Sequence, residues 1–193
     1  MKNKILVIIP VRIGSKRLKK KNILLIKNLP MFVLVAKEAL RSKYKPAVYI
    51  STESKKIIDI CNKYNLSYIE RPLRLAKDFV EKQEVIVDAV KKLKKIISPE
   101  IVISLQANTP EFSSKDLDKA IKFFNKKVFP GRPIRELITI NKNNLQDGAF
   151  RIMTKKTVFQ KTLSTKVGIY FTNYKDIHYK KEFLDVKKKI EKN

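Results

Sequence analysis

The chain has 193 residues, of which 44 are Lys or Arg and 18 are Asp or Glu, giving a formal net charge of +26. An apolar content of 44% is enough to bury one core, which excludes a disordered chain and favours a single domain over residues 1–193. No apolar run approaches the roughly 18 residues of a membrane span, and no cleavable leader is recognisable. We therefore expect a cytoplasmic protein with no membrane partner.

The positive charge does not by itself identify a partner. Only eight of the 44 basic residues are Arg, and the lysines recur along the whole chain. Solvated lysine faces on the helices would give the same count, so a basic nucleic-acid-binding module is kept only as an alternative. One stretch does exceed this background, because six of the ten residues 12–21 are cations.

Apolar periodicity predicts an α/β protein. In chain order we expect strands over residues 5–9, 47–51, 67–70 and 101–105, separated by helices over 31–42, 57–64 and 86–97. Ser113 and Asp116 have the spacing of a capping box before a helix through 117–124. Beyond residue 125 the pattern weakens, with strands expected at 135–140, 148–153 and 167–171 and a closing helix from about 180.

This alternation indicates a mostly parallel open sheet with right-handed crossovers. Ligands of such sheets bind beyond the carboxyl ends of the strands. The segments that matter therefore follow Val11, Ser51, Glu70 and Leu105.

The basic loop after the first strand is a candidate phosphate site. Gly14 would let the backbone approach an anion closely, and Ser15 would add a hydroxyl donor. The spacing is neither that of a Walker A loop nor that of a Gly-x-Gly-x-x-Gly turn. A solvated basic loop remains the alternative interpretation of the pattern alone.

A series of motifs resembles the cytidylyltransferases that activate sugar acids, the acylneuraminate and 3-deoxy-manno-octulosonate group. The motifs are Arg12-x-Gly14-Ser15-Lys16 with Lys21-Asn22, Ser51-Thr52-Glu53-Ser54, Arg71-Pro72 with Leu75-Ala76-Lys77-Asp78, Leu105-Gln106 with Pro110, Asp147-Gly148-Ala149 and Asp176-Ile177-His178. The resemblance implies a Rossmann-like three-layer nucleotidyltransferase fold. It also implies transfer of CMP from CTP to the anomeric hydroxyl of a sugar acid, with release of pyrophosphate.

The same resemblance implies roles for single residues. Arg12 and Lys21 would be catalytic and would neutralise the charge on the departing pyrophosphate. The nucleotide would be bound by Gly14, Ser15, Lys16, Asn22, Arg71 and Gln106. A surface arginine and a satisfied strand-end amide are the alternatives for Arg71 and Gln106. Asp78 would either orient a cation of the loop or cap the next helix.

The resemblance implies Mg²⁺ as cofactor, with Asp176 as a ligand. His178 stands where the family commonly has a second aspartate, and Asn108 where one branch has aspartate. Three hypotheses stay open: a metal held by Asp176, phosphates and water, a metal bound also by His178, or a site that has decayed. The last suggests a non-catalytic nucleotide-binding relative. The shortened excursion at about 126–146 leaves the sugar and a homodimer open.

Overall fold

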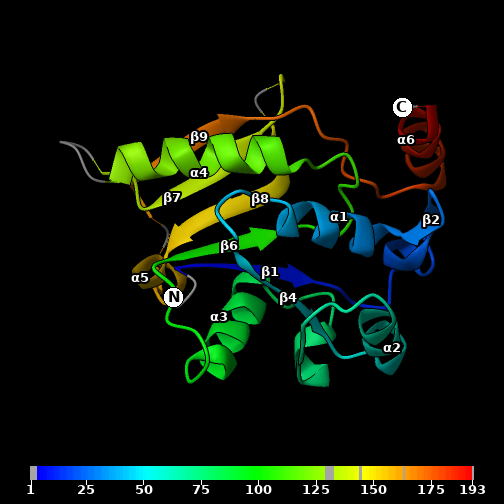
Figure 1. Ribbon diagram of the computed structural model, residues 1–193, viewed down its shortest axis with the longest axis horizontal. Coiled ribbons are helices and arrows are strands. Elements are labelled where there is room, and N and C mark those ends of the chain that lie inside the picture. Colours follow the sequence, from blue (N-terminus) through cyan, green and yellow to red (C-terminus); the bar gives the residue numbers. More distant parts are fainter. Residues whose placement is uncertain (1–3, 129–132, 144, 163, 193) are drawn as a thin grey trace.

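A single seven-stranded sheet forms the centre of the computed structural model, which describes residues 4–128, 133–143, 145–162 and 164–192 (Figure 1). The strand order is β5-β4-β1-β6-β8-β7-β9, and β8 alone runs antiparallel to its neighbours. The predicted mostly parallel sheet is thus confirmed. The strands are β1 Ile5–Pro10, β4 Ala47–Thr52, β5 Tyr68–Glu70, β6 Ile101–Leu105, β7 Glu136–Ile140, β8 Gln146–Thr154 and β9 Val167–Phe171.

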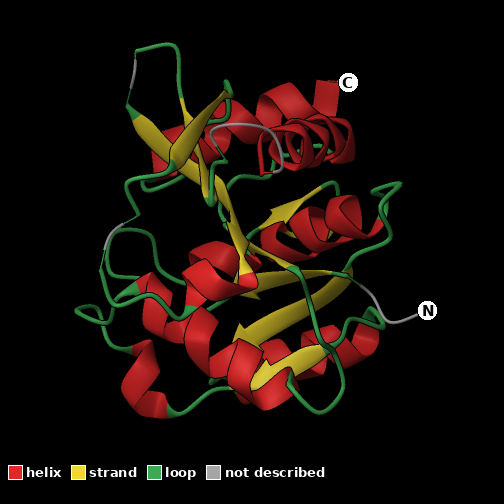
Figure 2. Cartoon of the chain, turned by 90° about the vertical axis from the view of Figure 1, so that its left-hand side faces the viewer, coloured by secondary structure: helices red, strands yellow, loops and turns green. Residues whose placement is uncertain are grey.

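Helices cover both faces of the sheet and complete three layers (Figures 1 and 2). Alternate residues of β1 explain the layering, because Val7 and Ile9 pack in a core with α1 and α4, whereas Leu6 and Ile8 pack in a second core with α3. Every one of these four side chains is fully buried. The helices are α1 Met31–Leu40, α2 Lys55–Lys63, α3 Lys82–Leu93, α4 Ser114–Val128, α5 Lys155–Val158 and α6 Lys180–Lys192.

The predicted capping residue at α4 is confirmed. Ser113 Oγ accepts a hydrogen bond from the Asp116 amide at 3.2 Å and donates to the Asp116 carboxylate at 2.9 Å. The predicted helix over 86–97 instead ends at Leu93, and Ile97 reaches the core from a turn. Pro99 follows closely, and the residue before a proline is disfavoured in a helix.

Several short elements were not predicted, because each is too brief to show a hydrophobic period. They are the 3₁₀ turns η1 Lys21–Ile23 and η2 Leu73–Ala76, the hairpin of β2 Leu25–Ile26 with β3 Leu29–Pro30, and helix α5. Of the excursion at 126–146, residues 129–132 and 144 lie outside the described residues, and the rest ends α4 and supplies β7 and the start of β8. Among the described helices, none has the length and apolarity that crossing a membrane would demand.

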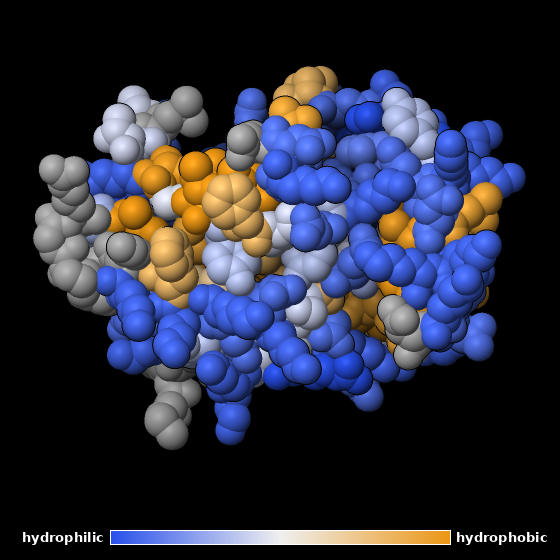
Figure 3. Space-filling model, turned by 90° about the horizontal axis from the view of Figure 1, so that it is seen from above, coloured by the Kyte–Doolittle hydropathy of each residue, from blue (hydrophilic) through white to orange (hydrophobic). Residues whose placement is uncertain are grey.

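β9 forms one edge of the sheet and carries exposed apolar side chains. Val167, Ile169 and Phe171 are 39%, 49% and 65% exposed. Figure 3 views the molecule from this side and shows apolar side chains gathered where β9 lies, on a face that is otherwise mostly hydrophilic. An unpaired edge with apolar side chains is a surface that another chain can cover.

Candidate active site

A cavity of about 250 Å³ opens beyond the carboxyl ends of β1 and β6. From β1 the chain runs to β4 and β5 on one side of that strand and then returns to β6 on its other side. Open α/β sheets bind ligands at the point where the strand order reverses in this way. The cavity brings together seven of the predicted site residues: Arg12, Ser15, Lys21, Asn22, Arg71, Gln106 and His178. Gly14, Lys16 and Asp176 do not line it.

The basic loop is held in place by a carboxylate on the opposite wall. Arg12 Nη1 lies 2.5 Å from Asp78 Oδ1, and Lys16 Nζ lies 2.7 Å from Asp78 Oδ2. Hydrogen bonds from Lys16 and Arg12 lower the pKa of Asp78. Asp78 therefore orients loop cations, as one hypothesis held, though not Lys21. The capping hypothesis is wrong, because Glu81 is the N-cap of α3.

Arg71 lines the cavity, but its guanidinium forms an ion pair with a buried carboxylate. Its Nε and Nη2 donate to Glu53 Oε2 at 3.0 and 2.6 Å, and the two side chains are 3% and 7% exposed. Glu53 Oε1 also accepts the Ile13 amide at 3.2 Å. Glu53 thus ties the end of β4, the end of β5 and the basic loop together. Glu53 belongs to one of the motifs, but no role was predicted for it from the sequence.

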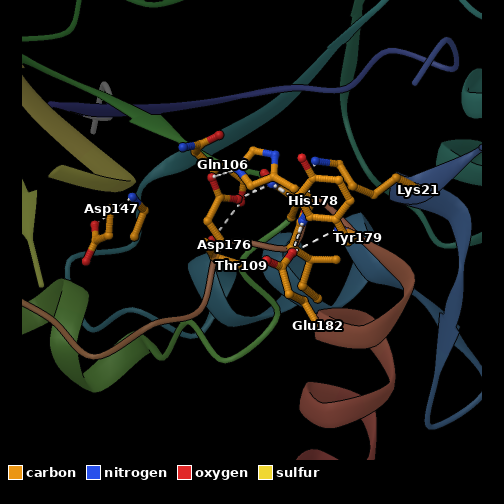
Figure 4. A network of polar contacts seen from close by, with 11 residues as sticks. Lys21, Gln106, Thr109, Asp147, Asp176, His178, Tyr179 and Glu182 are labelled. Atoms are coloured by element: carbon orange, nitrogen blue, oxygen red, sulfur yellow. Dashed lines mark hydrogen bonds and ion pairs between the residues drawn. The ribbon is translucent and has the colours of Figure 1, made fainter. Parts of the chain in front are cut away.

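A polar network joins the basic loop to the segment that precedes α6 (Figure 4). Lys21 Nζ donates to the Ile177 carbonyl at 2.7 Å. Burial lowers the pKa of Lys21, although the Asp176 carboxylate opposes that shift. On the same loop, Arg17 lies 5.8 Å from the centre of the Tyr179 ring. The loop and the start of α6 therefore form one wall.

Asp176 is a partly buried carboxylate with two nitrogen partners (Figure 4). The Asn108 side-chain amide donates to Oδ1, and His178 Nε2 lies 2.9 Å from Oδ2. Burial raises the pKa of Asp176, while His178 and Lys21 act in the opposite direction. Glu182 fixes the segment from α6, since its Oε2 accepts the His178 and Tyr179 amides at 2.6 and 2.9 Å.

Asp176 and His178 are the residues predicted as metal ligands. Asp176 and His178 do lie together, but no group of three His, Cys, Asp or Glu side chains suited to a metal ion occurs in the described ranges. His178 faces the carboxylate of Asp176 through Nε2. Asp78 lines the cavity but is paired with Arg12 and Lys16, whereas Asp176 lies beside His178, which is a lining residue.

Gln106 owes its position to a glycine on the neighbouring strand. Gly148 has φ +65°, and a Cβ there would collide with Gln106 Nε2. The backbone pairs as well, with the Gln106 amide donating to the Ala149 carbonyl at 2.9 Å. Gly14 differs: nothing lies within 4 Å of the position of a Cβ, so only a ligand would need its small size.

Two further lining residues complete the walls. Asn22 Nδ2 donates to the Arg12 carbonyl at 3.1 Å and so braces the loop from within. Lys82, the first residue of α3, also lines the cavity. Sequence reasoning missed Lys82, because a lysine in a lysine-rich chain carries no signal until its neighbours in space are known.

Residues 6–191 match a family model described as cytidylyltransferase. The chain belongs to the cytidylyltransferase family. This confirms the resemblance drawn from the motifs. The chain is 30% identical to post-translational flagellin modification protein B of Campylobacter coli, covering 94% of this chain and 80% of that one. It is 32% identical to N-acylneuraminate cytidylyltransferase of Escherichia coli, over 64% of this chain and 29% of the relative's length.

Solved structures agree on the fold. CMP:2-keto-3-deoxy-manno-octonic acid synthetase complexed with CTP superposes with a TM-score of 0.81 at 13% identity, covering 98% of this chain and 99% of that one. A cytidylyltransferase from Leptospira borgpetersenii gives 0.75 at 19% identity, over 98% and 87%. The predicted three-layer nucleotidyltransferase fold is therefore confirmed.

Proposed function

We propose that this cytidylyltransferase moves CMP from CTP to the anomeric hydroxyl of a sugar acid of the nonulosonate or octulosonate type. The observation that carries the proposal is that one cavity, at the ends of β1 and β6, gathers Arg12, Lys21 and Gln106 from distant parts of the chain. The family match and the names of the relatives support the same reaction class.

In this reaction the anomeric oxygen attacks the α-phosphorus of CTP and loses its proton to solvent. The bond between that phosphorus and the bridging oxygen breaks, so pyrophosphate leaves with the bonding electrons. Arg12 and Lys21 would neutralise the charge that grows on the leaving group. Gly14, Ser15 and Lys16 would hold the triphosphate. A triphosphate must also take over the cations that Asp78 now holds.

Asn22, Arg71 and Gln106 would bind the nucleoside part of CTP. Arg71 has the least freedom to do so, because Glu53 already accepts from two of its nitrogens. We therefore propose that Arg71 acts mainly by presenting a rigid wall, whereas the Gln106 amide can donate and accept toward the ligand.

The reaction class implies a divalent cation, and the residues present fit one that is held mostly by substrate. Magnesium commonly takes one or two carboxylates and fills its remaining positions with phosphates and water. Asp176 would be that carboxylate, with His178 orienting it at 2.9 Å. When bound, the ion would neutralise phosphate charge.

We propose a homodimer formed through the β9 edge, which exposes Ile169 and Phe171. Analytical ultracentrifugation of Phe171→Asp would test it, since a charge in a buried contact should yield monomers where the unaltered chain gives dimers. A cytoplasmic location is proposed as well, because CTP must be available to the enzyme.

The reaction is tested by pyrophosphate release from CTP with a panel of 2-keto-3-deoxy sugar acids and Mg²⁺. Arg12→Ala and Lys21→Ala should each abolish release without loss of the fold. Lys20→Ala is the matched control, because Lys20 neighbours Lys21 but does not line the cavity. Turnover in Arg12→Ala and Lys21→Ala equal to that of the unaltered chain would refute the mechanism.

A second candidate is a non-catalytic relative that binds a nucleotide. The partners of Asp176 favour it, since Asn108 and His178 occupy its two oxygens. Calorimetry distinguishes the two: CTP binding without turnover against every sugar acid in the panel would support the non-catalytic relative.

A further inference from the structure

Five basic residues line the cavity, and four of them already have a partner. Arg12 pairs with Asp78, Arg71 pairs with Glu53, and Lys21 donates to the Ile177 carbonyl. Lys77 Nζ lies over the Phe79 ring at 5.7 Å. Lys82 is the fifth, and across the described part of the chain its ammonium has no hydrogen bond or close ion pair.

The position of Lys82 is not explained by the stability of its helix. It is the first residue of α3, where the helix dipole disfavours a cation. The N-terminus is already completed without it, because Glu81 and Glu84 form a capping box, with the Glu81 amide donating to Glu84 Oε1 at 3.3 Å. A lysine at this position slightly destabilises the helix of the unliganded protein, and no partner among the described residues offsets that effect.

The electrostatic surroundings of Lys82 connect it to the centre of the site. Burial lowers the pKa of its ammonium, the Asp176 carboxylate opposes that shift, and Arg151 adds to it. The charge of Lys82 in turn lowers the pKa of Asp176, against the larger effect of burial. The basic loop, with Arg12 and Lys21, forms the wall on the other side of the cavity.

We propose that Lys82 is a substrate-binding residue that contacts an anionic group of the bound substrates from the α3 wall. This rests on the proposed function. The shared chemistry is a phosphate or carboxylate oxygen, supplied either by the nucleotide or by the sugar acid. Two anions meet in a cavity whose lining contains one carboxylate, Asp78, and an unpaired ammonium is the group that can stabilise them.

The test compares Lys82→Met with Lys91→Met, a control on the same helix outside the cavity. Calorimetry measures the affinity of each variant for cytidine, CMP and CTP. Steady-state kinetics then give KM for CTP and for a sugar acid. If the anion is a phosphate, Lys82→Met should weaken CMP and CTP binding about tenfold or more and leave cytidine unchanged. If it is the sugar carboxylate, nucleotide binding should hold and KM for the acceptor should rise about tenfold.

Lys82→Arg, which keeps the charge, should recover part of either loss. Nucleotide affinities and both KM values of Lys82→Met within twofold of those of Lys91→Met would overturn the inference. Equal loss of cytidine and CTP binding would also overturn it, because cytidine has no charge for Lys82 to meet. If the unaltered chain binds CTP but transfers CMP to no acceptor, the proposed reaction is wrong. The calorimetric affinities for cytidine, CMP and CTP still test the role of Lys82 in that case.

Discussion

Glu53→Gln should destabilise the protein far more than a surface charge removal. The change keeps the size of the side chain and an acceptor for the Ile13 amide, but it leaves the Arg71 guanidinium buried without a counter-charge. At 2.6 Å and an effective dielectric constant of about 20, the attraction lost is about 6 kcal/mol. Breaking such a pair costs about 3–5 kcal/mol in proteins, and we expect the free energy of unfolding to fall by about 3 kcal/mol.

Urea unfolding followed by circular dichroism measures this difference. Glu100→Gln is the control, because Glu100 pairs with Lys4 where both side chains are more than half exposed, and its loss should cost under about 1 kcal/mol. The double variant Glu53→Gln/Arg71→Met should regain most of the stability, since no buried charge remains. A Glu53→Gln variant within about 1 kcal/mol of the unaltered chain would refute the account of this pair.

Three further predictions concern other parts of the molecule. Gly148→Ala should destabilise the fold by about 1–2 kcal/mol and cut pyrophosphate release roughly tenfold or more, because the left-handed backbone is strained and Gln106 must move. Burial raises the pKa of Cys61 from its ordinary value of 9.0 to about 11, so between these values only the unfolded thiol ionises and stability falls. In urea titrations Cys61→Ala should lack that fall, worth up to about 3 kcal/mol. Asn108→Asp should tighten Mn²⁺ binding about tenfold in calorimetry, because it adds a carboxylate beside Asp176.

Each of these has an outcome that contradicts it. Gly14→Ala is the control for Gly148→Ala and should leave the free energy of unfolding unchanged, because its Cβ would meet open space. If both variants were equally stable, the left-handed backbone of Gly148 could not be the cause of any destabilisation. A stability difference between Cys61→Ala and the unaltered chain that stays constant from pH 8 to 11 would contradict the thiol prediction. Mn²⁺ affinity unchanged in Asn108→Asp would mean that no cation binds at Asp176.

The strands could be predicted because short runs of apolar, β-branched residues mark them locally in the sequence. Residues 101–105 and 167–171 form strands with the predicted bounds, and the β-branched run at 5–9 is the buried centre of the sheet. The reversed direction of β8 could not be predicted, because the spacing of hydrophobic residues is the same whichever way a strand runs. Short turns such as η2, with one buried residue, give no period at all.

For the site, motifs predicted most of the residues that gather in the cavity, but not how they are paired. Arg12, Lys21 and Gln106 meet in the cavity as expected. That Asp78 would hold Arg12 and Lys16, and Glu53 would hold Arg71, depends on distances between segments that lie apart in the sequence. Lys82 was missed for the same reason, since only the surroundings of a lysine separate it from 35 others in this chain.

The bond from Lys21 to the Ile177 carbonyl spans 156 positions of the chain. Synthesis proceeds from the amino end, so a nascent chain on the ribosome can pair β1 with β4 long before residue 177 emerges. During that interval Lys21 has no carbonyl to fix its ammonium, and Asn108 lacks its partner Asp176. The enzyme should therefore become competent only after the segment leading into α6 has been made and has docked.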